Sequence, residues 1–397
     1  MPHPDGPGQA GGPGQAAGSG QACGAHRAGP AWEDGETARV GYSRRVMPLG
    51  SPPTSPGAPE QLPGQLAFPG LDPEDQVPGP AQPVLPGFDE PLRPARGDED
   101  EELDRVATAL RAADPDTSKT AAAIRDAFDL LLDGQHTGRY RWDQLHKTEK
   151  THAGTLIEIG IQRRLELPDG STLDYCIDGV EVDCKFSHRS GGWMIPPEAE
   201  NRLLLLVQAS DEEGTWSAGL IRAREDYLRQ AGNRDLKRTL NDNGRGAIEW
   251  LSLDAALPEN ALLRLPERDV AAIFDWPKGQ QRVNELFRRA VGRRISRAVV
   301  ATVARQDDPM KRVRENGGAR DQLRSEGIVI FGDYAAHQAL AEALGLPVPG
   351  PGEFVSARLR RRTEADGVAR FVRLDGADWV VMVTDEPTGA APRLPRV

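Results

Sequence analysis

Glycine and proline are concentrated at one end of the chain, and this distribution decides how much of the chain can fold. The 397 residues include 43 glycines and 33 prolines, and 37 of these lie in the first hundred positions. A segment of that composition buries little apolar area, so we expect residues 1–104 to form a disordered, Gly/Pro-rich acidic extension. The remaining length suits two domains of ordinary size.

Charge is also distributed unevenly. Residues 1–104 carry 16 acidic and 6 basic side chains, whereas residues 260–397 carry 18 acidic and 23 basic ones. The basic last third indicates a nucleic-acid partner, although the whole chain has a net charge of −11. The excess of arginine over lysine, 42 to 7, matches what a GC-rich bacterial genome produces and does not by itself indicate a function.

Several classes of protein are excluded by what the sequence lacks. Apolar runs such as Leu203–Val207 are far below the ~18 residues of a membrane span, and the first residues lack the pattern of a secretory signal. The three cysteines show no Cys-x-x-Cys spacing for zinc, and the absence of a Gly-Lys dipeptide excludes a Walker-type phosphate loop. We therefore expect a cytoplasmic bacterial protein with no membrane contact and no nucleotide cofactor.

Apolar spacing and turn residues predict an α/β (α+β) fold class in two domains. We expect a first domain at 105–250, a linker at 251–263 and a second domain at 264–397. In the first domain the pattern predicts helices at 117–132 and about 152–164, then strands at 172–177, 180–186, 203–207 and 216–221. In the second, it predicts helices at 281–290, 295–305, 320–325 and 334–344, and strands at 328–331, 354–361, 369–374 and 379–383. Helices followed by a small sheet are typical of a winged-helix type of helix-turn-helix domain.

One predicted hairpin carries an unusual set of charged residues. Asp178-Gly179 between two alternating segments predicts a two-residue turn. With that turn, residues whose numbers sum to 357 face each other, so Asp174 lies opposite Asp183 and Thr172 opposite Lys185. One face of the hairpin is then apolar. The other face collects Asp174, Glu181, Asp183 and Lys185.

Facing carboxylates repel each other unless a cation lies between them. The simplest candidate is Mg²⁺, with Mn²⁺ as an alternative, because both prefer oxygen ligands. Lys185 is then placed to orient or deprotonate a water, and Glu158, an acid among apolar neighbours on the upstream helix, supplies a third carboxylate. The alternatives are an exposed polar sheet face with Asp–Lys pairs and a glutamate on a helix surface.

A helix Glu, a strand Asp and an Asp-x-Lys on the next strand follow the order of the PD-(D/E)-x-K nuclease site. Further strings resemble the NaeI family of type II restriction endonucleases, and the resemblance runs from about residue 110 to near the end. They are TEKTHAGTLIEI at 148–159, LDY at 173–175, VDCKFS at 182–187, GWMIPPE at 192–198 and VARQDDPMKR at 303–312.

This resemblance implies a PD-(D/E)-x-K endonuclease core followed by a winged-helix, helix-turn-helix DNA-binding domain. It implies a homodimer that binds double-stranded DNA at two sites per protomer and hydrolyses a phosphodiester within a GC-rich palindrome, with Mg²⁺. The second DNA copy, on the C-terminal domain, stimulates cleavage at the first. The catalytic positions fall on Glu158, Asp174, Asp183 and Lys185, and the metal ligands on the first three of these.

The segment 311–326 has the rhythm of a helix-turn-helix, with Gly317-Gly318 as the break. We expect its long polar side chains to contact DNA, although the alternative is a packing helix with solvated arginines. At the level of the whole chain, the alternative is a non-catalytic winged-helix DNA-binding regulator. The candidate DNA-binding residues are Arg312, Arg314, Arg320, Gln322 and Arg324.

Overall fold

The computed structural model describes residues 100–230, 234–382 and 389–395, so most of the predicted extension (1–99) lies outside the described residues. Its last residues, 101–104, form the first turn of helix α1 (Glu101–Ala113) instead of continuing an unstructured segment. The carboxylate of Asp100 caps this helix by accepting the N–H of Leu103, and three acidic residues in the first turn favour a helix N-terminus.

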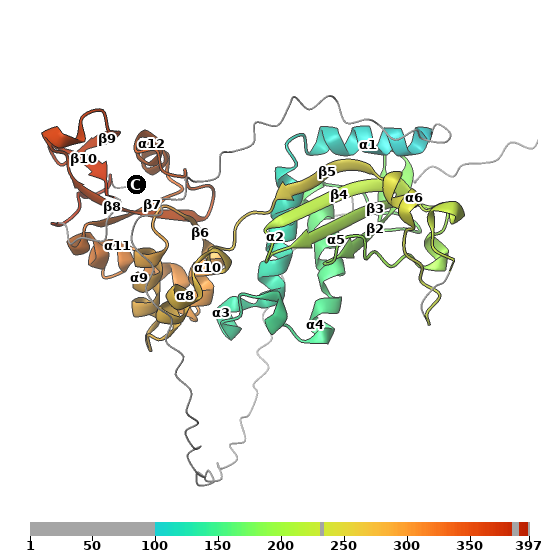
Figure 1. The fold of residues 1–397 in the computed structure, drawn as a ribbon, viewed down its shortest axis with the longest axis horizontal. Coiled ribbons are helices and arrows are strands. Elements are labelled where there is room, and N and C mark those ends of the chain that lie inside the picture. Colours follow the sequence, from blue (N-terminus) through green and yellow to red (C-terminus); the bar gives the residue numbers. More distant parts are fainter. Residues whose placement is uncertain (1–99, 231–233, 383–388, 396–397) are drawn as a thin grey trace, which may run out of the picture. The chain divides into compact units, whose positions relative to one another are not determined.

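A mixed five-stranded sheet forms the centre of the first-sheet region, residues 100–256 (Figure 1). Strand β2 runs parallel to β3, and the other neighbouring pairs are antiparallel. The expected strands are present, but the first is shorter than predicted and only three residues long. In sheet order the strands are β1 (Tyr175–Ile177), β2 (Val180–Ser187), β3 (Leu203–Ser210), β4 (Thr215–Arg222) and β5 (Glu249–Ala256).

The edge strand β5 corrects the expected linker. Residues 251–256 were expected to connect two domains, yet they pair with β4 along the edge of the sheet. The physical reason is that β4 presents a free row of backbone N–H and C=O groups, and an extended neighbour can satisfy them whatever its side chains. The linker prediction is therefore wrong for these six residues.

Both faces of this sheet are covered. Helices α1, α2 (Ser118–Leu132) and α5 (Ala153–Leu165) pack against one face, where Val182 and Cys184 lie (Figure 1). The other face, with Leu204 and Leu206, is covered by segments around Trp193 and Leu228. The shorter helices of the region are α3 (Gly134–Thr137), α4 (Lys147–Thr151) and α6 (Asp242–Gly246), with 3-10 turns at Trp142–Gln144, Pro197–Ala199 and Glu225–Tyr227.

Helix α2 begins one residue after its predicted start, and a side chain upstream of the N-cap position caps it. Thr117 occupies the N-cap position without a capping side-chain hydrogen bond. The carboxylate of Asp114 instead accepts the backbone N–H groups of Lys119 and Thr120. An acid three residues upstream of Thr117 therefore caps this helix.

The second-sheet region, residues 261–381, is richer in helices at its start and in strands at its end, as predicted. However, an unpredicted strand at 294–296 takes the first residues of the helix expected at 295–305, which begins at Arg297 instead. Strand β8 (Glu353–Arg361) lies in the middle of the second sheet and pairs with β6, β7 and β10. Strand β9 pairs with β10. This arrangement confirms a mixed α/β class. The helices are α7 (Ala261–Arg264), α8 (Glu267–Phe274), α9 (Gly279–Arg289), α10 (Arg297–Ala304), α11 (Ala319–Gln322) and α12 (Ala335–Ala343), with 3-10 turns at Pro309–Arg312, Leu323–Glu326 and Glu364–Asp366. The strands are β6 (Arg294–Ser296), β7 (Ile328–Gly332), β8 (Glu353–Arg361), β9 (Phe371–Leu374) and β10 (Ala377–Val381).

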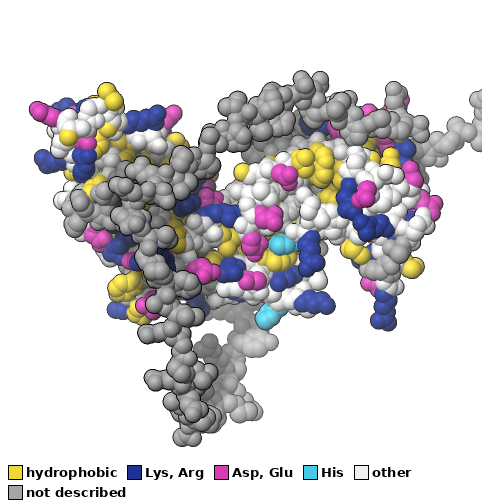
Figure 2. Space-filling view, in the orientation of Figure 1, with side chains coloured by type: hydrophobic (Ala, Val, Ile, Leu, Met, Phe, Trp, Pro, Cys, Tyr) yellow, Lys and Arg dark blue, Asp and Glu magenta, His cyan; other side chains and the backbone are white. Residues whose placement is uncertain are grey.

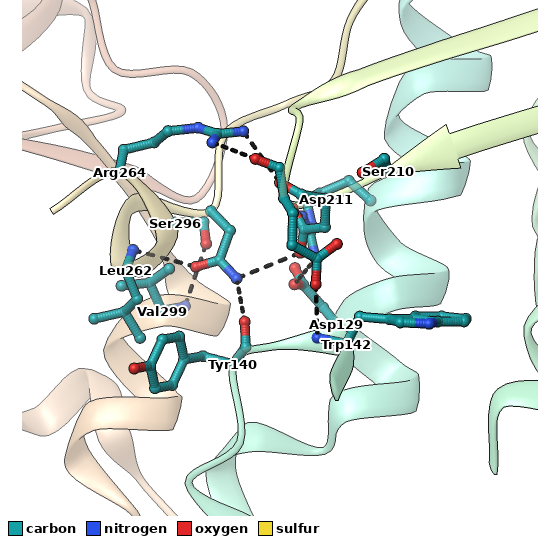
Figure 3. A network of polar contacts seen from close by, with 12 residues as sticks. Asp129, Tyr140, Trp142, Ser210, Asp211, Leu262, Arg264, Ser296 and Val299 are labelled. Carbon is teal, nitrogen blue, oxygen red and sulfur yellow. Dashed lines mark hydrogen bonds and ion pairs between the residues drawn. The ribbon is translucent and has the colours of Figure 1, made fainter. Parts of the chain in front are cut away.

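A buried ion cluster lies beside the turn between β3 and β4. The guanidinium of Arg125 contacts Asp211 through Nη1 at 2.5 Å and Asp129 through Nη2 at 2.8 Å. Arg125 is only 6 % exposed. We call these three residues the junction cluster, because residues of the second-sheet region contact the same turn (Figure 3).

Two side chains from residues 260–264, at the start of the second-sheet region, contact this turn. Arg264 donates to the backbone carbonyls of Asp211 and Glu212, at 3.1 and 2.7 Å. Asn260 donates through Nδ2 to the carbonyl of Tyr140 at 3.0 Å, and the same group lies 3.5 Å from Asp211. The turn is thus held by polar contacts from both sequence regions (Figure 3).

Lys and Arg side chains are interspersed with Asp and Glu on the face drawn in Figure 2, so no single-sign patch covers that face. Among the residues that the structure describes, no helix is both long and apolar enough to cross a membrane.

Candidate active site: carboxylates and a lysine at an open strand edge

The predicted hairpin register is present where β1 exists. Tyr175 pairs with Val182 and Ile177 with Val180, so paired residue numbers sum to 357. Asp178 and Gly179 form the turn with φ of 48° and 76°, a left-handed conformation typical of Asp-Gly hairpins. Because β1 begins only at Tyr175, the ladder with β2 stops before Asp183, and the expected pairing of Thr172 with Lys185 is wrong.

Asp174 replaces the missing ladder by a side-chain contact. It lies directly before β1, and its Oδ2 accepts the backbone N–H of Cys184 at 2.6 Å. A carboxylate is a strong acceptor for such an N–H, and the contact brings the side chain of Asp174 to the open edge of β2. The expected closeness of Asp174 and Asp183 is therefore achieved across a splayed hairpin.

Asp183 is the most buried member of the group, with 7 % of its surface exposed. Its Oδ2 lies 2.5 Å from the Nζ of Lys185 but, among the described residues, has no partner of hydrogen-bonding geometry. Burial raises the pKa of Asp183, and the neighbouring Asp174 carboxylate raises it further, whereas Lys185 lowers it. Lys185 also donates to the carbonyl of Cys184 at 3.1 Å.

Glu158 completes the group from helix α5. It is half-buried, and its carbonyl oxygen accepts the hydroxyl of Tyr175 at 2.9 Å, which ties the helix to β1. Burial raises the pKa of Glu158, as do the charges of Asp174 and Asp183, and Lys185 lowers it. The four predicted catalytic residues therefore lie within electrostatic reach of one another.

The donor set fits a hard divalent cation. Three carboxylates and one ammonium leave two uncompensated negative charges when all are ionised, and carboxylate oxygens are the ligands Mg²⁺ prefers. The buried Oδ2 of Asp183 is an acceptor without a hydrogen bond. Over the described ranges, however, no three Asp, Glu, His or Cys side chains are already drawn together closely enough to hold a metal ion.

Glu181 has a role that the sequence pattern did not reveal. It was grouped with the polar face of the hairpin, but its carboxylate accepts hydrogen bonds from residues 171–173, the loop before Asp174. Burial alone would raise the pKa of Glu181, but these hydrogen bonds hold it at about 2. The available signal was the run Gly170-Ser171-Thr172, which offers small residues and free donors beside an acidic strand.

Two of the candidate DNA-binding residues lie on the segment between α10 and α11. Arg312 donates through Nε to Gln306 Oε1 at 2.6 Å. Arg314 is largely exposed, and its guanidinium lies 3.8 Å from the carboxylate of Asp308. Of these two, Arg314 is the one whose charge faces solvent.

Arg320 points into the protein. It donates through Nε to the carbonyl of Ile330 at 3.0 Å, and its guanidinium lies over the rings of Tyr334 and Phe354 at 5.9 and 5.8 Å. These contacts favour the packing alternative for this residue. The helical phase of a four-residue helix could not be read from the sequence.

Gln322 and Arg324 are both engaged with neighbouring chain. Gln322 is exposed, donates to the carbonyl of Gly317 and accepts from Asn284, both at 2.6 Å. Arg324 is half-buried and donates to the carbonyl of Ala391 at 3.3 Å. Contact of these two residues with DNA stays a prediction.

The fold and this acidic group with one lysine are typical of a nuclease, and comparison with known proteins agrees. Residues 104–390 match the family described as restriction endonuclease NaeI. The chain belongs to this family of restriction endonucleases, so the predicted enzyme class, a type II site-specific endonuclease, is confirmed.

A relative of known name covers most of the chain. The Type II restriction enzyme NaeI of Lentzea aerocolonigenes is 48 % identical over 313 residues, which are 77 % of this chain and 98 % of that enzyme. The family match over residues 104–390 includes both sheets.

Proposed function

We propose that this protein is a Mg²⁺-dependent endonuclease that acts as a cytoplasmic homodimer on double-stranded DNA. Its target is a GC-rich palindrome, and a second DNA copy on the C-terminal domain stimulates cleavage. Residues 101–256 form the PD-(D/E)-x-K endonuclease domain, and residues 264–397 the DNA-binding domain. A twofold-symmetric protein suits a palindrome because the two half-sites are related by the same symmetry.

One observation carries the nuclease assignment. Asp183 and Lys185 project from the part of β2 that has lost its ladder with β1, beside Asp174 and within electrostatic reach of Glu158. Excess negative charge and a buried acceptor without a hydrogen bond destabilise a strand edge. This arrangement is therefore better explained by binding of an exchangeable cation than by a contribution to stability. Glu158, Asp174 and Asp183 would hold the metal.

The bound metal, Mg²⁺ or alternatively Mn²⁺, supplies Lewis acidity toward the phosphate and the attacking water. Lys185 is fixed by its contacts with Asp183 and the Cys184 carbonyl, so its remaining ammonium donor is available to orient a water or a phosphate oxygen. In hydrolysis, water adds to phosphorus, the P–O3′ bond breaks and the 3′ oxygen takes a proton. The products carry a 5′-phosphate and a 3′-hydroxyl.

The topology of the second-sheet region supports a winged-helix domain. Helix α9, strand β6, helices α10 and α11, and strands β7 and β8 follow one another, and both β6 and β7 pair with β8. This order of helix, strand, two helices and a strand pair is that of a winged helix, with α12 inserted between the paired strands. The short α11 then takes the place of the recognition helix.

The five candidate DNA-binding side chains differ in how firmly contacts within the protein hold them, and we expect the exposed ones to contact DNA. Arg314 and Gln322 are exposed, Arg312 and Arg324 are held by single side-chain hydrogen bonds, and Arg320 is packed inward. Surface arginines that contact phosphates add affinity that falls with salt. We therefore expect Arg314→Ala to weaken DNA binding more than Arg320→Lys does at matched folding stability.

Plasmid cleavage in Mg²⁺ and in EDTA tests the nuclease assignment. Discrete fragments in Mg²⁺ and intact plasmid in EDTA are expected, and Lys185→Ala should remove the activity. A plasmid with one target site should be cut poorly until an oligonucleotide bearing the target is added. Intact DNA under all conditions, with sequence-specific binding retained, would favour the non-catalytic regulator instead, and equal rates on one-site and two-site plasmids would refute the second DNA site.

A further inference from the structure

A single carboxylate holds the loop that leads into Asp174. Glu181 accepts the backbone N–H of Ser171 at 2.7 Å, of Thr172 at 3.1 Å and of Leu173 at 2.8 Å. The hydroxyl of Ser171 donates to the same carboxylate at 2.7 Å. Three consecutive amides and one hydroxyl thus converge on one anion, as in the anion-binding nests of other loops.

The loop closes tightly around this carboxylate. A Cβ atom at Gly170 would lie 2.1 Å from the carbonyl oxygen of Leu173 and 2.8 Å from Glu181 Oε2. Only glycine fits such a close approach without moving the loop. Gly170 also donates its N–H to the carbonyl oxygen of Asp174 at 3.2 Å, so residues 170–174 form one closed turn.

This turn takes over the task that a longer β1 would perform. At Asp174 the ladder with β2 has ended, and contacts from Gly170, Glu181 and Cys184 fix this residue and its loop instead. The carboxylate of Glu181 holds the preceding backbone, and the N–H of Cys184 holds the side chain. Hydrogen bonds to an ionised carboxylate are stronger than neutral ones, so the loop is well anchored.

Glu181 is already saturated as an acceptor. Its Oε1 accepts two hydrogen bonds from Ser171, and its Oε2 accepts one each from Thr172 and Leu173. A carboxylate has about four acceptor positions. Direct binding of a cation by Glu181 would therefore require releasing the loop.

We propose that Glu181 is a positioning residue, which fixes the Asp174 carboxylate beside Asp183 in the arrangement that binds a divalent cation. This inference rests on the proposed nuclease function. Residues that hold metal ligands in place from outside the coordination shell commonly change metal affinity when they are replaced.

The test uses the full-length protein and Glu181→Gln, which keeps the shape but turns one acceptor into a donor that faces N–H groups. Asp178→Asn is the matched control, because it removes one carboxylate from the same hairpin and asparagine tolerates the left-handed turn. Two properties are measured: the Mg²⁺ concentration for half-maximal plasmid cleavage, and Mn²⁺ binding by calorimetry without DNA. Hydrogen exchange of the amides of residues 171–173 reports the state of the loop.

For Glu181→Gln we expect a half-saturating Mg²⁺ concentration about tenfold higher or more. The maximal rate should recover largely at high Mg²⁺, Mn²⁺ should bind correspondingly more weakly, and the amides of residues 171–173 should lose protection. Ser171→Ala removes one donor and should shift the metal requirement by less than about threefold. Asp178→Asn should leave all three measurements unchanged.

The proposal would be overturned if Glu181→Gln loses protection of the amides of residues 171–173 but needs no more Mg²⁺ for cleavage than Asp178→Asn does. If Glu181→Gln fails to fold, Gly170→Ala serves instead, because its methyl group pushes the loop off the carboxylate, and the same shift is required of it. If the unsubstituted protein does not cleave DNA, the proposed function fails, while Mn²⁺ calorimetry and amide exchange still decide the role of Glu181.

Discussion

The active-site hairpin and the junction cluster both bury more carboxylates than cations, yet they are built differently. In the junction cluster one guanidinium, Arg125, lies between Asp129 and Asp211, and the backbone around Asp211 is held by Arg264. At the hairpin, Lys185 alone faces three carboxylates at the edge of a strand whose ladder has ended.

The difference teaches how a structural charge cluster can be told from a binding one. The junction cluster places one guanidinium between its two acids, with a different Nη atom on each, beside a turn that two parts of the chain hold closed. The hairpin leaves two negative charges uncompensated, against one in the junction cluster, and it lies at an open strand edge. Fixed partners favour a role in stability, whereas uncompensated charge at an open edge favours a ligand that comes and goes.

The largest effect is expected at the hairpin. Asp183→Asn should reduce cleavage by about a thousandfold or more, since it removes a metal ligand while keeping the shape of the side chain. The same change relieves carboxylate repulsion, so the midpoint of thermal unfolding should stay constant or rise. Steady-state cleavage and a melting curve measure the two properties, and a large fall in melting temperature would place Asp183 with the structural acids.

At the junction cluster the expectation is reversed. Arg125→Met should lower the free energy of unfolding by about 3–5 kcal/mol, because it leaves the buried Asp211 and the half-buried Asp129 without their cation. Urea titration at pH 7 measures this loss. As a control, Arg105→Met removes an exposed ion pair with Asp178 at 4.0 Å and should cost less than about 1 kcal/mol. Equal losses in the two variants would break the comparison.

The smallest effect is a pH dependence. Burial raises the pKa of Asp129 from 3.8 to about 6, so between these values the folded protein binds a proton that the unfolded chain does not. This group therefore stabilises the fold more as the pH falls from 7 to 5, by about 1 kcal/mol. Asp129→Asn should lack this gain. Urea titrations of parent and variant at both pH values measure it, and a parent–variant difference that does not change with pH would contradict it.

Much of the hairpin could be predicted from the sequence. Asp178-Gly179 determines a tight turn, the turn determines the register, and the register places Asp183 and Lys185 on the same side of β2. The positions of α2, β3 and β4 also followed from apolar spacing, because those elements bury a regular face, although β3 continues three residues beyond its predicted end at 207.

The remaining details depend on contacts that local patterns do not contain. Where β1 ends early, Glu181 accepts the amides of residues 171–173 and Asp169 bridges Tyr175, so these contacts stand in place of a longer ladder. The inward turn of Arg320 depends on the rings of Tyr334 and Phe354 brought near by the fold. Such outcomes are tertiary, so propensity alone does not decide them.

Cys184 lies between the two charged residues of the Asp-x-Lys motif, and the rate at which its thiol is alkylated reports how often the site opens. Burial raises the pKa of its thiol to about 12, and only the thiolate of a cysteine reacts quickly with alkylating reagents. Alkylation of the thiol therefore requires β2 to separate transiently from its neighbours. The alkylation rate then depends on the frequency of these openings. Mass spectrometry of the peptide that contains Cys184 would measure this alkylation rate. A cation bound by Asp174 and Asp183 should lower the rate, and this effect can be measured without any DNA being cut.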